Sequence, residues 1–97
     1  MEYIIKPYNG RVVLPKRGYF KKGDSGEDIA LISSFLAFNF LGFESVLKIK
    51  VDSMLGDYFG SSLESWIKQF QKINGLLVDG CIGSKTLNKM REYGLNA

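Results

Sequence analysis

The residue types that could catalyse a reaction are scarce in this chain. Its 97 residues include no histidine and a single cysteine, Cys81. This composition excludes an intrachain disulfide, a zinc site built from Cys and His, and a His-based catalytic triad. Hydrolysis would then require a pair of carboxylates, and the spacing of the acidic residues singles out no such pair. We therefore expect no catalytic residue, no metal ligand and no cofactor in this sequence.

Cys81 lies in a turn, and no basic residue adjoins it in sequence to lower its pKa. We interpret it as a small, half-buried side chain rather than a reactive thiol.

Side chains that could bind a ligand lie on two turns of similar pattern. Segments 56–63 and 79–86 each run through a turn, an apolar residue, a glycine and a serine to the start of a helix. A looser third copy spans Gly23–Gly26, so the pattern favours a small helical domain built from repeated units. The binding candidates are the polar residues of both turns and the tryptophan between them: Asp57, Tyr58, Ser61, Trp66, Asp79, Ser84 and Lys85.

Several of these candidates also have a structural alternative. Asp57 and Asp79 fit ordinary turn chemistry, and Ser61 and Ser84 fit helix capping. The helical spacing of Trp66 favours the core, whereas its size favours the surface. The sequence alone leaves both interpretations open.

Three helices must position these turns, and each is expected to open at a polar residue. A side-chain oxygen at that place can accept one of the free amides of the first helical turn. The predicted helices cover residues 27–40 after an Asp24 or Ser25 cap, residues 61–74 with Ser61 and Glu64 as a capping box, and residues 85–93 after a Ser84 cap. Phe59 and Ile82, which precede the second and third helices, are expected in the core.

The first predicted helix has two apolar faces, so it needs cover on two sides. The second face could be covered by the leading segment or by self-association with another copy of the chain. One face carries Ile29, Ile32, Leu36 and Phe40, and the other carries Leu31, Phe35 and Phe38.

The remaining segments complete a mainly α, compact three-helix domain with repeated turn-helix units. Residues 46–51 partly alternate apolar and charged side chains, which allows a short hairpin in the connector at residues 41–56. We place a leading segment at residues 1–19 and the domain at residues 20–97. Residues 1–22 hold six basic side chains and one acidic one. This charge could favour an anionic partner, although a solvated linker explains it more simply.

The chain gives no sign of membrane insertion or export. No apolar run approaches the roughly 20 residues of a membrane span. The first residues lack the basic start and apolar core of a signal peptide. We expect no membrane partner.

The motifs around the second turn resemble those of the peptidoglycan-binding domain type 1 family, over about residues 20–94. That family has Phe-Gln, then Gly-Leu, then Asp-Gly-x-x-Gly-x-x-Thr. The matching residues are Phe70-Gln71, Gly75-Leu76, Asp79-Gly80, Gly83 and Thr86, with Gly23, Gly26, Ile29 and Ile32 matching the first motif. The sequence departs from the family at Ser33 in place of Gln, Gly56-Asp57 in place of Asp-Gly, Leu63 in place of Thr, Trp66 in place of a frequent Ala, and in a longer connector.

The resemblance implies a non-catalytic module that binds bacterial peptidoglycan or another wall polymer. Such a module tethers the catalytic domain of a lysin to its substrate and raises its effective concentration there. Residues 14–20 resemble the junction that precedes these domains in bacteriophage endolysins of Gram-positive hosts. The implied location is the host cytoplasm until release, then the bacterial wall.

A rival interpretation is a small basic phage or bacterial protein that acts in assembly or contacts nucleic acid. The basic leading segment and the second apolar face of the first helix support it. The bases are not arranged along one helix face and no standard nucleic-acid motif is present, so we disfavour a nucleic-acid partner.

Overall fold

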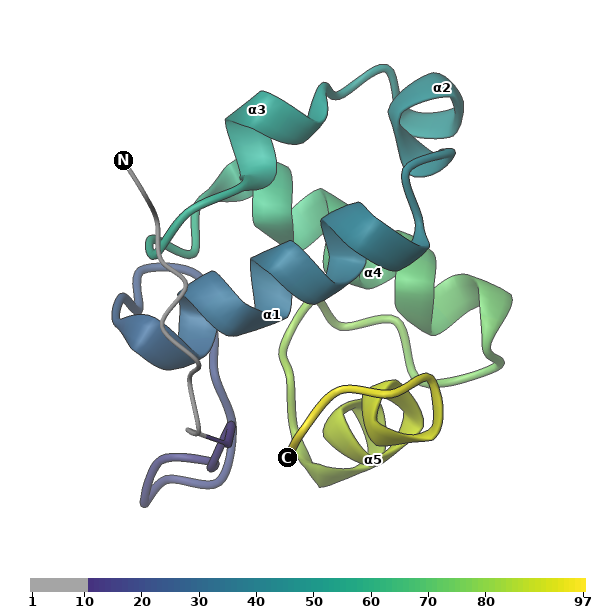
Figure 1. Cartoon of the computed structure of the whole chain (residues 1–97). Coiled ribbons are helices and arrows are strands. Elements are labelled where there is room, and N and C mark those ends of the chain that lie inside the picture. The colour runs from purple at the N-terminus through teal and green to yellow at the C-terminus, as the bar shows by residue number, and fades with distance from the viewer. Residues whose placement is uncertain (1–10) are drawn as a thin grey trace.

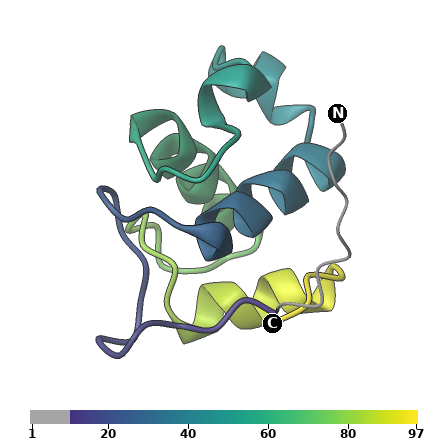
Figure 2. The same ribbon diagram turned by 60° about the vertical axis from the view of Figure 1, so that its left-hand side comes forward.

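The computed structural model describes residues 11–97, which are mainly helical. The three longer helices, α1, α4 and α5, correspond to the three predicted ones, so the mainly α class is confirmed. Helices α2 and α3 lie on one side of the pair formed by α1 and α4, and α5 lies on the other (Figures 1 and 2). The helices are α1 (Glu27–Asn39), α2 (Phe43–Leu47), α3 (Val51–Met54), α4 (Ser61–Ile73) and α5 (Ser84–Glu92).

The predicted hairpin in the connector is wrong, because residues 41–56 fold into the short helices α2 and α3. Lys48 adopts the left-handed conformation, with φ of 60°, and this ends α2. The Glu44 carboxylate then accepts the amide of Val51 at 2.7 Å, at the start of α3. Phe43 and Met54 point into the core, and both short helices contact α4. The packing of both short helices on α4 therefore decides the conformation of this segment, rather than the weak alternation of apolar and charged residues in its sequence.

The predicted serine caps are also wrong, since a glycine occupies the N-cap of each longer helix. Gly26, Gly60 and Gly83 precede α1, α4 and α5, and no side chain makes a capping hydrogen bond. Ser61 and Ser84 are the first residues inside their helices, one position beyond the cap. Both side chains are exposed, which leaves their hydroxyls available to a ligand.

Asp24 closes a turn before α1 instead of capping the helix. Its carboxylate accepts the amide of Lys21 at 2.9 Å and pairs with the guanidinium of Arg17. Burial opposes ionisation of this carboxyl, but the bonds from Arg17 and Lys21 outweigh it and hold the pKa of Asp24 below its ordinary value. The predicted Ser25 cap is wrong because Gly26 occupies the N-cap of α1.

The segment that precedes α1 binds the two repeated turns together. Phe20 and Ile82 exchange backbone hydrogen bonds of 3.0 and 2.9 Å. Further along, the amide of Gly23 donates to the carbonyl of Phe59 at 2.8 Å, and the amide of Phe59 donates to the carbonyl of Asp24 at 2.8 Å. These short antiparallel contacts are the only extended pairing in residues 11–97. They fix both turns to the same piece of chain.

Part of the predicted leading segment packs on the helical domain. Val12 is 2% exposed and belongs to the same hydrophobic core as the helices. Its amide donates to the carbonyl of Asn96 at 2.9 Å. The predicted boundary at residue 20 stays a prediction, and residues 1–10 lie outside the described residues.

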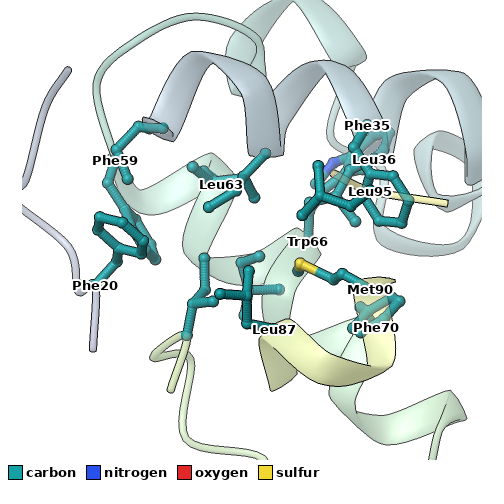
Figure 3. Packing of buried hydrophobic residues seen from close by; sticks show 14 of the residues in the cluster. Phe20, Phe35, Leu36, Phe59, Leu63, Trp66, Phe70, Leu87, Met90 and Leu95 are labelled. Atoms are coloured by element: carbon teal, nitrogen blue, oxygen red, sulfur yellow. The ribbon is translucent and has the colours of Figure 1, made fainter. Parts of the chain in front are cut away.

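Trp66 of α4 lies among the buried side chains of the hydrophobic core (Figure 3). Its side chain is 0% exposed, and its ring lies 5.4 Å from that of Phe43. The indole Nε1 donates to the carbonyl of Ile49 at 3.3 Å. The helical spacing therefore predicted its place correctly, and its assignment as a ligand contact does not fit the structure. Phe59 and Ile82 are buried as predicted.

The second apolar face of α1 is only partly covered. Phe35 is buried, Leu31 is half-buried, and Phe38 is 88% exposed. A shallow apolar groove of about 290 Å³ runs between this face and the last residues, Gly94 to Asn96. No helix in residues 11–97 is long and apolar enough to cross a membrane.

Candidate functional site

The second turn is held by one buried side chain, Gln71 on α4. Its Oε1 accepts the backbone amides of Asp79 at 3.1 Å and Gly80 at 2.9 Å. Its Nε2 donates to Oδ1 of Asp79 at 3.0 Å, to the carbonyl of Cys81 at 2.8 Å and to Oγ1 of Thr86 at 3.1 Å. The two N–H groups of Nε2 are shared among these three acceptors. Because Gln71 is 1% exposed, its side chain finds all of its hydrogen-bond partners within the protein. The turn is therefore preorganised.

Asp79 uses one carboxylate oxygen to build the turn. Its Oδ1 accepts the amide of Cys81 at 2.9 Å as well as the bond from Gln71. Such an Asp turn mimics a backbone turn and leads directly into Gly80, whose φ of 76° favours glycine. The residue as a whole is exposed. The turn-building role considered for Asp79 is thus real, and its second carboxylate oxygen accepts no hydrogen bond within residues 11–97.

A groove of about 430 Å³ opens beside this turn, between the end of α4 and the start of α5. Three of the sequence-predicted candidates line it together: Asp79, Ser84 and Lys85. The groove thus combines a carboxylate, a hydroxyl and an ammonium with an apolar wall that includes Leu77, which is 79% exposed. The complete lining is Gly75, Leu76, Leu77, Asp79, Cys81, Gly83, Ser84, Lys85 and Thr86. We call it the second-turn groove.

Cys81 lines the second-turn groove as a half-buried free thiol. Burial, and then the negative charges of Asp79 and Glu64, raise the pKa of this thiol above its ordinary value, although Lys21 and Arg17 oppose the shift. A raised pKa keeps sulfur in its less reactive protonated form. The structure therefore supports the structural interpretation of Cys81.

The first turn is anchored in a related way by Ser33 of α1. Its hydroxyl donates to the carbonyl of Gly56 at 2.9 Å and accepts the amide of the same residue at 3.1 Å. Gly56 occupies the place in the first repeat that Asp79 occupies in the second. A short hydroxyl therefore links helix to turn in the first repeat, as the longer amide of Gln71 does in the second.

The first-turn candidates are exposed but do not line the second-turn groove. The carbonyl of Asp57 accepts the amide of Gly26 at 2.8 Å, so its backbone fixes the start of α1. Tyr58 is 59% exposed and packs near Gly60, where an added Cβ would lie 3.3 Å from the ring. Ser61 starts α4. The structure thus assembles the second-turn candidates into one groove and leaves Asp57, Tyr58 and Ser61 on a separate surface.

Three residues that shape the groove were not predicted from the sequence. Gln71 and Thr86 were predicted only as motif positions, and Leu77 had no predicted role. The available signal was a glutamine at an apolar helix position, directly after Phe70. A polar residue on a buried face requires partners, and the adjacent turn is where those partners lie.

No metal site accompanies the groove. Among residues 11–97, no three Cys, Asp or Glu side chains gather closely enough to hold a metal ion.

These features define a small helical binding module: glycine-initiated helices, two anchored turns and an exposed polar groove. The chain belongs to the peptidoglycan binding domain family, whose family model matches residues 25–90. The family assignment confirms the resemblance seen in the motifs, and it makes the chain a cell-wall binding module.

A solved structure supports the same fold. The chain is similar to the crystal structure of the SleB N-terminal domain, with 31% sequence identity and a TM-score of 0.61. The similarity covers 77% of this chain and 90% of that one. No curated protein matches the sequence.

Proposed function

We propose that the second-turn groove binds peptidoglycan, and that the module acts without catalysis as the targeting domain of a phage endolysin or related wall hydrolase. The observation that supports this is the convergence of Asp79, Ser84 and Lys85 on one open groove next to the exposed Leu77. Polymer ligands of this kind offer hydroxyl, amide and carboxylate groups together with apolar ring and methyl faces. A groove with both polar and apolar walls matches that mixture.

The rigid turn supports binding because little ordering remains to be done. Gln71 fixes Asp79, Gly80 and Cys81 before any ligand arrives. A preorganised site loses less conformational entropy on binding than a mobile one. The proposal includes a Gram-positive host, storage of the protein in the host cytoplasm until lysis, and a wall hydrolase as the parent protein. A tethered hydrolase would meet its bonds at raised local concentration.

The proposed function is tested by sedimentation with purified bacterial peptidoglycan. We expect the wild-type protein to pellet with the polymer. The double variant Leu77→Ala/Lys85→Gln should bind about tenfold more weakly, because it loses an apolar contact and a charged donor. Lys50→Gln is the matched control, since Lys50 is exposed and precedes α3, which lies on the opposite side of α1 and α4 from α5 (Figure 1).

Two outcomes would contradict the proposal. One is a wild-type protein that stays in solution with peptidoglycan but shifts DNA in a salt-dependent gel assay. The other is a Leu77→Ala/Lys85→Gln variant that binds peptidoglycan as tightly as Lys50→Gln does.

We also propose that the uncovered face of α1 supports weak self-association through Leu31, Phe35 and Phe38. The exposure of Phe38 and the adjacent groove support it. Phe35 is itself buried, so it supports this apolar face from beneath the exposed side chains.

A further inference from the structure

A further groove adjoins the start of α5, where it shares Ser84 with the second-turn groove. It has a volume of about 270 Å³ and runs between the first described residues and α5. Figure 2 shows the segment that begins at residue 11 passing beside that helix. Its lining is Arg11, Val12, Val13, Leu14, Ser84, Leu87, Asn88, Arg91 and Ala97. We call it the arginine groove.

The charged side chains that line the arginine groove have one sign. Arg11 and Arg91 line it, and none of its lining residues is Asp or Glu. Arg11 is exposed and has no hydrogen-bond or ion-pair partner among residues 11–97. Two guanidinium groups with no acidic side chain in the lining favour an anionic ligand.

Arg91 is held in place from two sides. Its Nη1 donates to Oδ1 of Asn88 at 2.6 Å, and its Nε donates to the carbonyl of Ala97 at 2.7 Å. These bonds leave Nη2 for a ligand. Because Oδ1 of Asn88 is occupied, its amide nitrogen remains as a further donor in the groove. Ser84 adds an exposed hydroxyl.

The wall that carries Arg11 is fixed to the domain. Val12 is buried, and its amide bonds to Asn96. Burial raises the pKa of the Asp28 carboxyl on α1, and the backbone amide of Val13 opposes that shift. The described start of the chain therefore forms a groove wall and not a loose basic tail.

The two grooves meet at Ser84, which lines both. A polymer lying in the second-turn groove can therefore continue into the arginine groove without leaving the protein surface. We infer that the arginine groove binds the free carboxylates on the peptide stems of the peptidoglycan strand held in the second-turn groove. This inference rests on the proposed function, and it names the chemical group that the neighbouring groove recognises.

The test compares two ligands and three variants. The ligands are peptidoglycan freed of teichoic acids, with its peptide carboxylates either native or chemically amidated. We expect Arg11→Gln to bind the native polymer about threefold more weakly than wild type, and Arg11→Gln/Arg91→Gln about tenfold more weakly. Lys50→Gln removes the same charge outside the groove and should bind as wild type does. On the amidated polymer, wild type and the arginine variants should bind equally.

The outcomes separate this inference from the proposed function. If wild type does not bind native peptidoglycan, the proposed function fails. If wild type binds but both arginine variants match Lys50→Gln, only the arginine groove is refuted. A loss that persists on the amidated polymer also overturns it. Arg11→Gln keeps the test valid if Arg91→Gln disturbs folding, because Arg11 makes no bond within the described chain.

Discussion

The side-chain nitrogen of Gln71 lies 3.0 Å from Oδ1 of Asp79, which joins the core of α4 to an exposed turn. A single buried amide thereby positions the residue at one edge of the second-turn groove. The stability of the domain and the shape of its candidate site are coupled through this contact.

Replacing Gln71 tests that coupling. Gln71→Leu should lower the free energy of unfolding by roughly 2–3 kcal/mol, since the amide of Gly80 would be left buried without an acceptor. Urea denaturation measures the change. Gln71→Glu is the informative partner: it keeps the acceptor but places a second carboxylate beside Asp79. Like charges raise the pKa of the introduced carboxyl, so the stability of this variant should recover as the pH falls. A Leu variant as stable as wild type would refute the anchoring role.

Trp66 should report on the core and not on the ligand. It is the single tryptophan of the chain and is fully buried. We expect blue-shifted emission, weak quenching by acrylamide, and no spectral change when the protein binds soluble peptidoglycan fragments. Trp66→Phe should cost about 1–3 kcal/mol of stability while the folded fraction still binds. Ligand-dependent quenching of Trp66 would contradict its position in the structure.

Tyr58 distinguishes the two turns. It is exposed on the first turn and does not line the second-turn groove. Tyr58→Ala should therefore leave peptidoglycan binding within about twofold of wild type, whereas Leu77→Ala/Lys85→Gln reduces it. Sedimentation of both variants under the same conditions measures the difference. A larger loss with Tyr58→Ala would move the binding surface to the first turn.

Cys81 should react slowly with iodoacetamide. Its raised pKa lowers the thiolate fraction at any given pH, so the midpoint of its pH–rate profile should lie above that of the urea-unfolded chain. Because Cys81 lines the second-turn groove, bound peptidoglycan fragments should slow alkylation further. Equal rates with and without fragments would count against binding in this groove.

Phe38 should control self-association. Phe38→Lys removes the most exposed aromatic side chain of the described residues and places a charge beside the apolar groove of α1. Any concentration-dependent rise in mass seen by light scattering should disappear in this variant. Val46→Lys, at another exposed apolar position, is the control and should retain it. If wild type is monomeric at millimolar concentration, the self-association proposal is wrong.

Some features followed from local sequence because local chemistry produces them. The apolar spacing of α1, α4 and α5 predicted the three longer helices. The motifs around the repeated turns predicted the protein family. The same spacing favoured a buried Trp66. Helix starts were less predictable, because a glycine N-cap and a serine N-cap differ by one residue and leave nearly the same sequence pattern around Ser61 and Ser84.

The connector illustrates why other features were not predictable. Residues 46–51 partly alternate apolar and charged side chains, and this pattern allowed a short hairpin. Their conformation depends on Phe43 and Met54 reaching the core over α4, which is a property of the packed domain.

The sequence by itself determined the fold class, the family and the turn that carries Asp79, because helical periodicity and Asp-Gly turns act over a few residues. Only the tertiary structure decided which candidates share a groove. It placed Trp66 in the core, left Tyr58 outside the groove that Lys85 lines, and brought Arg11 and Arg91 into the lining of one groove although they lie far apart in the sequence. Such contacts are set by how helices pack and by where a buried group such as Gln71 finds its hydrogen-bond partners.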